Sequence, residues 1–274
     1  MIRYLEHHYA SHMEEVDASL KKLALLMARL TEIEINALKK YRLNTETVVP
    51  SLTIKGVDLL SEERLNKIFK EELQGKLNTD KSNVIGSMLV KRYAFIAALV
   101  LYSMSAFDKG INGSIQNVSL QTDESDPLWL PSFYFDHLEV TTPEIDRTEW
   151  RTSVVQSLFL ENIVKVITSI SKQAKVAKTI LWENIAVYIF WMYETLLQDD
   201  SFSQEQLVKI QEDFYYVIHD APPQLFGTKA LNPFSQYDLP KQNDVRMRKT
   251  CCLFYLTSKN DDRCTTCPIK CKRL

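Results

Sequence analysis

Glycine is scarce in this sequence, and cysteine is absent before its last 24 residues. Only six of the 274 residues are glycine, and neither the G-x-G-x-x-G fingerprint of dinucleotide-binding folds nor a Walker P-loop occurs. We therefore expect the chain to have no nicotinamide or flavin site of its own. Any redox chemistry would then need an external reduced electron carrier.

A strong net charge and a long apolar run are also lacking. The 33 Lys and Arg residues face 35 Asp and Glu residues, so the chain has no global basic field and we expect no nucleic-acid partner. No stretch reaches the roughly 20 apolar residues that a membrane span needs. The nearest candidate is residues 93–107, and the charged Lys91, Arg92 and Asp108 beside it favour a buried core helix.

The first residues, MIRYLEHHYASHMEE, do not contain the apolar core of a secretory signal peptide. We therefore expect a cytoplasmic protein, in a compartment where thiols stay reduced and disulfides are rare. The odd number of cysteines agrees, because five cannot all pair within one chain.

Helical periodicity dominates the chain. Apolar residues at three- and four-residue spacing predict helices over residues 13–41, 83–107, 148–172 and 177–197. Ser61, followed by two glutamates, predicts the start of a helix that ends near Gly75. The capping-box pattern from Ser203 to Gln206 predicts a further helix to Ile218, which Pro222-Pro223 terminates.

Two short β-prone runs, at residues 115–120 and 129–140, predict a small antiparallel element between turn residues. Residues 224–242 have little periodicity and are typical of loops. We expect an α+β, predominantly helical fold. It would consist of a body over residues 1–243, with any subdomain boundary near 110–145, and a metal-binding tail over residues 244–274.

All five cysteines lie in this tail, as Cys251 and Cys252, eleven intervening residues, and then Cys264, Cys267 and Cys271. Thiols this close together predict a metal site rather than core packing. Four thiolates can hold either zinc or an iron-sulfur cluster. The tail therefore predicts a structural zinc site or an electron-transfer centre.

The adjacent cysteines Cys251 and Cys252 distinguish a zinc site from an iron-sulfur cluster better than the Cys264-x-x-Cys267 loop does. Zinc ribbons also have two residues between paired cysteines, so that spacing fits both kinds of site. Neighbouring residues in an extended backbone point to opposite sides, so their sulfurs chelate one small ion poorly. Cysteine sulfurs can reach a larger metal cluster from two directions. The residues favour an iron-sulfur cluster, with structural zinc and a redox-active dithiol or free thiols as the alternatives.

A resemblance to a known family rests on Arg248-Lys249-Thr250-Cys251-Cys252-Leu253-Phe254-Tyr255 and on Cys264-Thr265-Thr266-Cys267-Pro268. These segments resemble the C-terminal signature of the FhuF-like ferric siderophore reductases, whose Cys-Cys-x10-Cys-x2-Cys motif holds a [2Fe-2S] cluster. Leu181-Trp182-Glu183-Asn184-Ile185-Ala186 and Asn232-Pro233-Phe234 are similar to segments of that family, less specifically. Two features depart from the motif: the spacer has eleven residues instead of ten, and Cys271 has no counterpart.

The resemblance implies that Cys251, Cys252, Cys264 and Cys267 bind the cluster. Cys271, which has no counterpart in the motif, is a fifth thiol that could substitute as a ligand. It implies an oxidoreductase that acts on metal ions and reduces the Fe(III) of a bound siderophore in the cytoplasm, releasing Fe(II). The substrate would be a hydroxamate, citrate-hydroxamate or catecholate complex. The electron would come from an external reduced carrier.

The tail is basic, with eight Lys and Arg residues against two Asp residues from Val245 to Leu274. Cations stabilise an anionic thiolate cluster and attract anionic ligands. The candidates for binding an anionic ferric chelate and setting the cluster potential are Arg246, Arg248, Lys249 and Arg263. A solvated basic tail is the ordinary alternative.

Two other functions fit parts of the sequence. In the first, the chain is an interaction protein with structural zinc, whose basic tail binds an acidic partner. In the second, it is a siderophore-biosynthetic relative with the same helical body. The cysteine tail argues against the second, because an acyl- or amide-forming synthetase has no need of a thiolate cluster.

Other candidate residues have ordinary structural explanations. His8 and His12 are one helical turn apart and could bind a metal, but solvated histidines are common near a terminus. His137 and His219 are isolated. Core packing competes with a role in a chelate pocket for the aromatic residues Tyr188, Phe190, Trp191, Tyr193, Phe214-Tyr215-Tyr216 and Phe133-Tyr134-Phe135. Glu183 and Asn184 lie within an apolar helix and need polar partners or a cavity.

Overall fold

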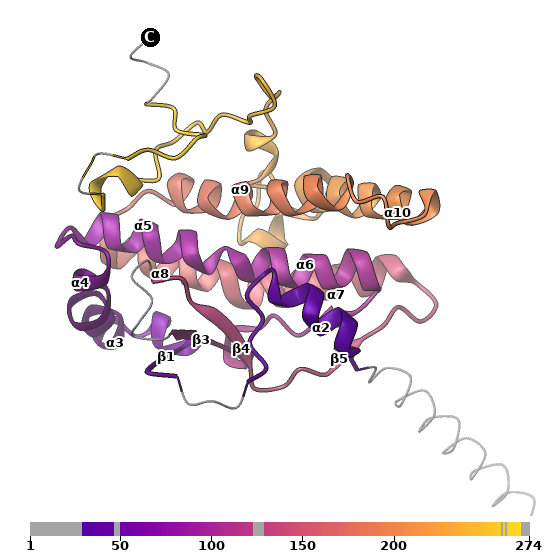
Figure 1. The fold of residues 1–274 in the computed structure, drawn as a ribbon, viewed down its shortest axis with the longest axis horizontal. Coiled ribbons are helices and arrows are strands. Elements are labelled where there is room, and N and C mark those ends of the chain that lie inside the picture. The colour runs from indigo at the N-terminus through magenta and orange to yellow at the C-terminus, as the bar shows by residue number, and fades with distance from the viewer. Residues whose placement is uncertain (1–28, 47–49, 123–128, 259, 261, 270–274) are drawn as a thin grey trace, which may run out of the picture.

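The computed structural model describes residues 29–46, 50–122, 129–258, 260 and 262–269. Two layers of helices lie over a small antiparallel sheet (Figure 1). Helices α9 (Lys178–Leu196) and α10 (Gln204–Tyr215) form the upper layer, and the sheet lies on the opposite side of the molecule. The fold is α+β and predominantly helical, as predicted.

The middle layer contains the most apolar of the described helices, α6 (Phe95–Phe107). Helices α5 (Ser82–Tyr93) and α6 follow each other with only Ala94 between them, and α9 packs along both. Every residue from Ile96 to Leu101 is fully buried. A helix that is apolar on all sides is stable only when other elements surround it, and the prediction of a buried core helix over residues 93–107 is confirmed.

Two helical stretches, Ser82–Phe107 and Arg147–Ala174, have the length and hydropathy of a membrane span. In the first, 83% of the most apolar window is buried inside the fold, and in the second 50% is buried. Core helices of water-soluble proteins pass the same test. Length and composition are therefore weak evidence for a membrane span here.

The remaining helices of the body agree with the predictions. Helices α7 (Arg147–Leu158) and α8 (Val164–Ala174) are joined by a π-helical turn, as are α3 (Glu62–Lys67) and α4 (Gln74–Lys76). The Ser61 side chain caps α3 by accepting from the Arg64 N–H. The predicted capping box of Ser203 and Gln206 is present at the start of α10.

The predicted helix over residues 13–41 is only partly correct. Residues 1–28 lie outside the described part of the chain. Within it, helix α2 (Glu32–Lys39) begins after Thr31, so an unbroken helix through residues 29–31 is wrong. The reason is local: Thr31 has an extended backbone, and its side chain forms a capping box with Glu34.

The sheet has the order β1 (Leu52–Lys55), β3 (Val118–Thr122), β4 (Ser132–Phe135), and all pairs are antiparallel. Ile54, Leu120 and Phe133 lie side by side across it and are buried against the helices. Strands β2 (Gly110–Ile111) and β5 (Val140–Thr141) form a separate pair. The predicted antiparallel element is confirmed, and it includes β1 as a further strand that the sequence pattern did not predict.

We predict that Gly86→Ala destabilises the fold, although alanine is the better helix former by about 1 kcal/mol. Gly86 is buried in α5, and an added Cβ would lie 2.5 Å from the Ala174 Cβ of α8 and 3.0 Å from a methyl of Ile170. Overpacking of this kind costs about 1–3 kcal/mol. Urea unfolding measures the loss.

Gly75→Ala is the matched control for this prediction. Gly75 is exposed in α4, and an added Cβ there meets no atom within 4 Å. It should raise the free energy of unfolding by about 0.5–1 kcal/mol. Equal gains from the two substitutions would show that α5 and α8 are not packed as closely as described.

Candidate metal centre

The cysteine tail folds back onto the body and rests on helices α5 and α9 (Figure 1). Its principal anchor is Glu183, a carboxylate in the second turn of α9 that is only 3% exposed. One carboxylate oxygen accepts the Lys249 N–H at 2.5 Å, and the other accepts the Thr250 N–H at 2.7 Å and the Thr250 hydroxyl. The backbone directly before the first cysteine is thereby fixed to the helix.

Arg248 balances the buried charge of Glu183. It is 5% exposed, and its Nε lies 3.7 Å from a Glu183 oxygen. The same guanidinium donates to the Asn184 side-chain oxygen at 2.7 Å and to the Thr250 carbonyl at 3.1 Å. A buried carboxylate and a buried guanidinium are stable only with such partners, so this pair and its hydrogen bonds form one unit.

Asn184 extends this unit to α5. Its amide donates to the Ser87 carbonyl at 2.9 Å and lies 3.1 Å from the Ser87 hydroxyl. The Ser87 hydroxyl in turn donates to the Cys252 carbonyl at 2.8 Å. The prediction that Glu183 and Asn184 meet polar partners inside an apolar helix is confirmed. Those partners belong to the cysteine tail and to α5.

The tail itself is closed by backbone hydrogen bonds. The Arg248 N–H donates to the Thr266 carbonyl at 3.1 Å, which joins the two cysteine segments, and the Cys267 N–H donates to the Cys264 carbonyl at 3.1 Å. Leu253, with φ of 65°, turns the chain sharply after the adjacent pair. Its N–H points at the Cys251 sulfur at 3.4 Å.

The four described cysteines are brought together and are grouped in pairs. The Cys252 and Cys264 sulfurs are 3.9 Å apart, and the Cys251 thiol interacts with that of Cys267. All four are free thiols, because a disulfide would need about 2.05 Å between sulfurs. Adjacent residues thus face different partners, as the sequence predicted. Cys271 lies outside the described residues.

Positive charge reaches this group of sulfurs from the body. The Lys91 ammonium, on α5, donates to the Cys252 sulfur at 3.6 Å. The hydrogen bond from Cys264, together with Lys91 and Arg248, lowers the pKa of the Cys252 thiol to about 5. The same hydrogen bond between the two thiols raises the pKa of the Cys264 thiol. Burial raises the pKa of Cys251.

These features fit a thiolate-bound [2Fe-2S] cluster. The four described sulfurs, two from each cysteine segment, would form its donor set. Lys91 and the N–H of Leu253 supply the hydrogen bonds that stabilise anionic sulfur.

A cavity of about 480 Å³ opens beside the cysteines. Cys264, Thr265 and Thr266 form one side of it, and the aromatic side chains Phe95, Tyr188, Phe190 and Trp191 form another. Its charged lining residues are Lys91, Glu194, Asp244, Arg246 and Arg248. Cys264, one residue of the cysteine group, therefore lies in the wall of a cavity large enough for a small ligand.

The four predicted substrate-binding cations have different positions. Arg248 is buried in the unit with Glu183, and Arg246 pairs with Glu194 and with Asp238, each at 2.8 Å. Both line the cavity. Lys249 is exposed, and the Arg263 guanidinium lies over the ring of Tyr255. Neither of the latter two belongs to the described lining of the cavity.

The aromatic candidates divide in the same way. Tyr188, Phe190 and Trp191 line the cavity, whereas Tyr193 is buried against Phe214. In the run Phe133-Tyr134-Phe135, the two phenylalanines are core residues.

Lys91 and Ser87 were not predicted as site residues. The only signal in the sequence was the charged pair Lys91 and Arg92 beside the apolar run of residues 93–107.

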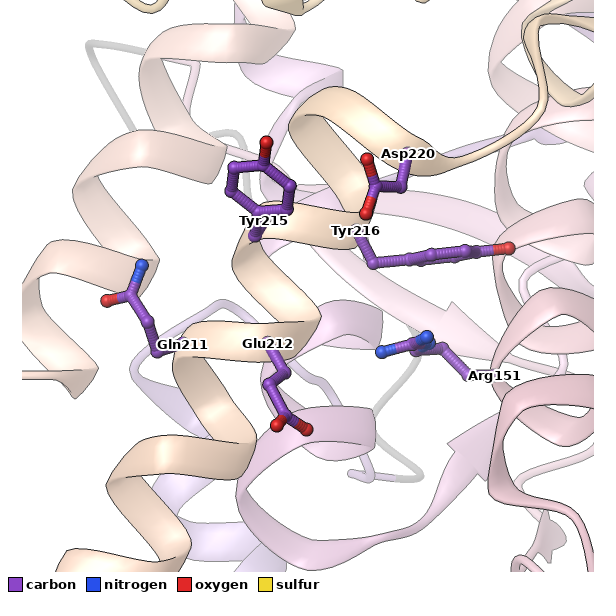
Figure 2. A pocket seen from close by; sticks show the side chains of 6 residues that line it. All are labelled: Arg151, Gln211, Glu212, Tyr215, Tyr216 and Asp220. Atoms are coloured by element: carbon purple, nitrogen blue, oxygen red, sulfur yellow. The ribbon is translucent and has the colours of Figure 1, made fainter.

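A second cavity, of about 440 Å³, lies on α10 (Figure 2). Figure 2 shows Tyr215, Tyr216 and Asp220 on one side and Arg151 facing them, with the Arg151 guanidinium 4.0 Å from the centre of the Tyr216 ring. Arg151 also pairs with the buried Asp213 at 3.1 Å. This cavity shares no lining residue with the cysteine site, and its Arg151 joins α7 to α10 through Asp213.

The isolated histidines do not join the cysteine site. His219 pairs with Asp238 at 3.1 Å and packs on Tyr215, and His137 is exposed with its backbone bonded to Asn117. His8 and His12 lie outside the described residues.

The family comparisons agree with this site. A family model described as ferric iron reductase FhuF-like transporter matches residues 87–215, and the FhuF 2Fe-2S C-terminal domain matches residues 248–268. Together they cover more than half of the chain. The protein belongs to the FhuF-like family, and its C-terminal segment is a [2Fe-2S] domain that contains four of the five cysteines. Among curated proteins, no match is found.

We predict that Glu183→Gln loosens the tail, because the buried Arg248 loses its counter-charge. Removing one partner of a buried pair costs about 3–5 kcal/mol. Limited proteolysis should cut residues 244–274 faster than in the unchanged protein, and the yield of bound iron should fall. The control is Glu194→Gln, which removes the more exposed partner of Arg246 and Lys241 and should cost less than about 1 kcal/mol. Equal proteolysis of the two variants would contradict the role of Glu183.

Proposed function

We propose that this protein is a cytoplasmic reductase of ferric siderophores. In this proposal Cys251, Cys252, Cys264 and Cys267 bind the [2Fe-2S] cluster, and the cavity beside them binds the chelate. The observation that carries the proposal is that one cysteine, Cys264, belongs both to the sulfur group and to the wall of the cavity. An electron donor and an iron complex would be in direct contact there.

The cavity suits an oxygen-donor iron chelate in size and chemistry. Its volume of about 480 Å³ is within the range of small-molecule pockets. The aromatic wall can pack on the organic arms of a chelator, and cations in the lining can attract an anionic complex. A hydroxamate, citrate-hydroxamate or catecholate complex presents both features.

Release of iron follows from a single electron. A bound [2Fe-2S] cluster carries one electron at a time. Hard oxygen ligands hold Fe(III) more tightly than Fe(II), so one electron moved to the chelated Fe(III) gives an Fe(II) that dissociates. The side chains of the site have only to hold the chelate against Cys264 and to keep the sulfurs anionic. No general acid or nucleophile is needed, and the chelator stays intact.

The electron must come from outside the chain. The sequence has no Gly-rich dinucleotide-binding loop, so an external reduced carrier would reload the cluster after each turnover. A cytoplasmic location fits this chemistry, because reduced carriers and free thiols coexist there.

The cluster itself is tested by its colour and its iron content. Protein purified without oxygen should absorb visible light, bleach on reduction and contain about two irons per chain. The reduced protein should then convert a ferric chelate to Fe(II), which a ferrous-specific dye traps. A colourless protein with one zinc ion per chain would instead support a structural-zinc interaction protein.

The ligand set is tested by single substitutions. Cys251→Ser, Cys252→Ser, Cys264→Ser and Cys267→Ser should each lose the visible absorption or shift it strongly, since serine is a poor ligand for this cluster. Cys271→Ser is the matched control and should retain both the absorption and the iron. Loss of the cluster in Cys271→Ser, together with retention in Cys264→Ser or Cys267→Ser, would move the site to the fifth cysteine.

A further inference from the structure

Lys91 occupies the boundary between the sulfur group and the cavity. Its ammonium lies 3.6 Å from the Cys252 sulfur, and the same residue lines the cavity. It comes from α5, whose neighbouring residue Ser87 is bonded to the Cys252 carbonyl. The Phe254 ring, 5.0 Å from the ammonium, holds it from the tail side. Its position is therefore set by both the body and the tail.

The other two cations in the described lining of the cavity are the guanidinium groups of Arg248 and Arg246, and both already form ion pairs with protein carboxylates. Arg248 is bound to Glu183, Asn184 and Thr250, and Arg246 is bound to Glu194 and Asp238. Lys91, by contrast, forms no ion pair with any carboxylate in the described part of the chain. Its charge is the part of the cavity lining that an anionic ligand can use without breaking a protein ion pair.

We propose that Lys91 has two functions that follow from this single position, given the proposed reductase function on which this inference rests. It raises the potential of the cluster by donating to the Cys252 sulfur, because a nearby cation stabilises the additional negative charge of the reduced state. It also selects anionic over neutral ferric chelates, because it presents a charged donor to the cavity. Lys91 is thus a positioning and specificity-determining residue.

The test uses the cluster-loaded full-length protein and two readouts other than turnover. The first is the midpoint potential of the cluster without substrate. The second is the dissociation constant for Ga(III) chelates, which carry the charge of the ferric complexes but do not accept the electron. A tris-catecholate complex serves as the anionic probe and a tris-hydroxamate complex as the neutral one.

In Lys91→Gln we expect a lower midpoint potential and an affinity for the anionic complex reduced about tenfold or more, the usual loss for one charge-assisted hydrogen bond. Affinity for the neutral complex should change little. Lys91→Arg keeps the charge and should restore most of the anionic preference. If Lys91→Gln does not retain the cluster, Lys91→Arg still tests the proposal, since it must keep the preference.

Lys70→Gln is the matched control. Lys70 is exposed in the segment Ile68–Leu73, which packs on the side of α5 opposite the tail (Figure 1). Loss of this charge should alter neither readout.

Three results would overturn the proposal. They are an unchanged potential in Lys91→Gln, an equal loss of affinity for both complexes, and a change in only one of the two readouts. Failure of the unchanged protein to bind either complex would overturn the cavity assignment in the proposed function as well. In that case the potential of Lys91→Gln still reports separately on the contact with Cys252.

Discussion

The site depends on one buried carboxylate. Glu183 sits in the most buried part of α9 and receives three hydrogen bonds from residues 249 and 250. An ionised carboxylate in such surroundings is costly unless it is paired and hydrogen-bonded, and the partners that satisfy it all belong to the tail. The apolar body therefore cannot keep Glu183 buried without the tail in place, and the tail has no comparable anchor elsewhere among the described contacts.

This dependence explains why the cations of the site have separate roles. Sulfur ligands bring negative charge into a partly buried region, and positive charge must accompany them. Arg248 balances Glu183, and Arg246 links the tail to α9 through Glu194. Both arginines hold the tail in place through ion pairs with carboxylates, so their positive charge is largely compensated. Lys91 contacts the Cys252 sulfur and also lines the cavity, and among the described lining residues it is the cation that forms no ion pair with a carboxylate.

Much of this could be predicted from the sequence. The helices have strong periodicity and recognisable caps, such as Ser61 and the Ser203 capping box. The cysteine pattern favoured an iron-sulfur cluster over zinc, and the resemblance to the FhuF-like family specified a [2Fe-2S] cluster. Glu183 and Asn184 were conspicuous because polar residues in an apolar helix need partners. Lys91 and Ser87 were not predictable, because they lie 161 and 165 residues from Cys252 in the sequence. Strand β1 was missed because four residues carry too little alternation to distinguish a strand from a loop.

The bonding of the residues that line the cavity limits the kind of ligand recognition that the cavity could provide. Specific hydrogen-bond recognition needs buried, unpaired polar groups aimed at the ligand. In the described lining of the cavity, Arg248 and Arg246 are bonded to protein carboxylates, and the buried polar atom without a hydrogen-bond partner is the Arg246 Nε. The rest of the lining includes the aromatic wall, the Lys91 ammonium, the carboxylates of Glu194 and Asp244, and Cys264 with Thr265 and Thr266. Such a surface distinguishes ligands by charge and by flat apolar area rather than by individual functional groups. A reductase that used this cavity as proposed would accept several chelators of similar charge, because such a lining has few groups that distinguish one chelator from another.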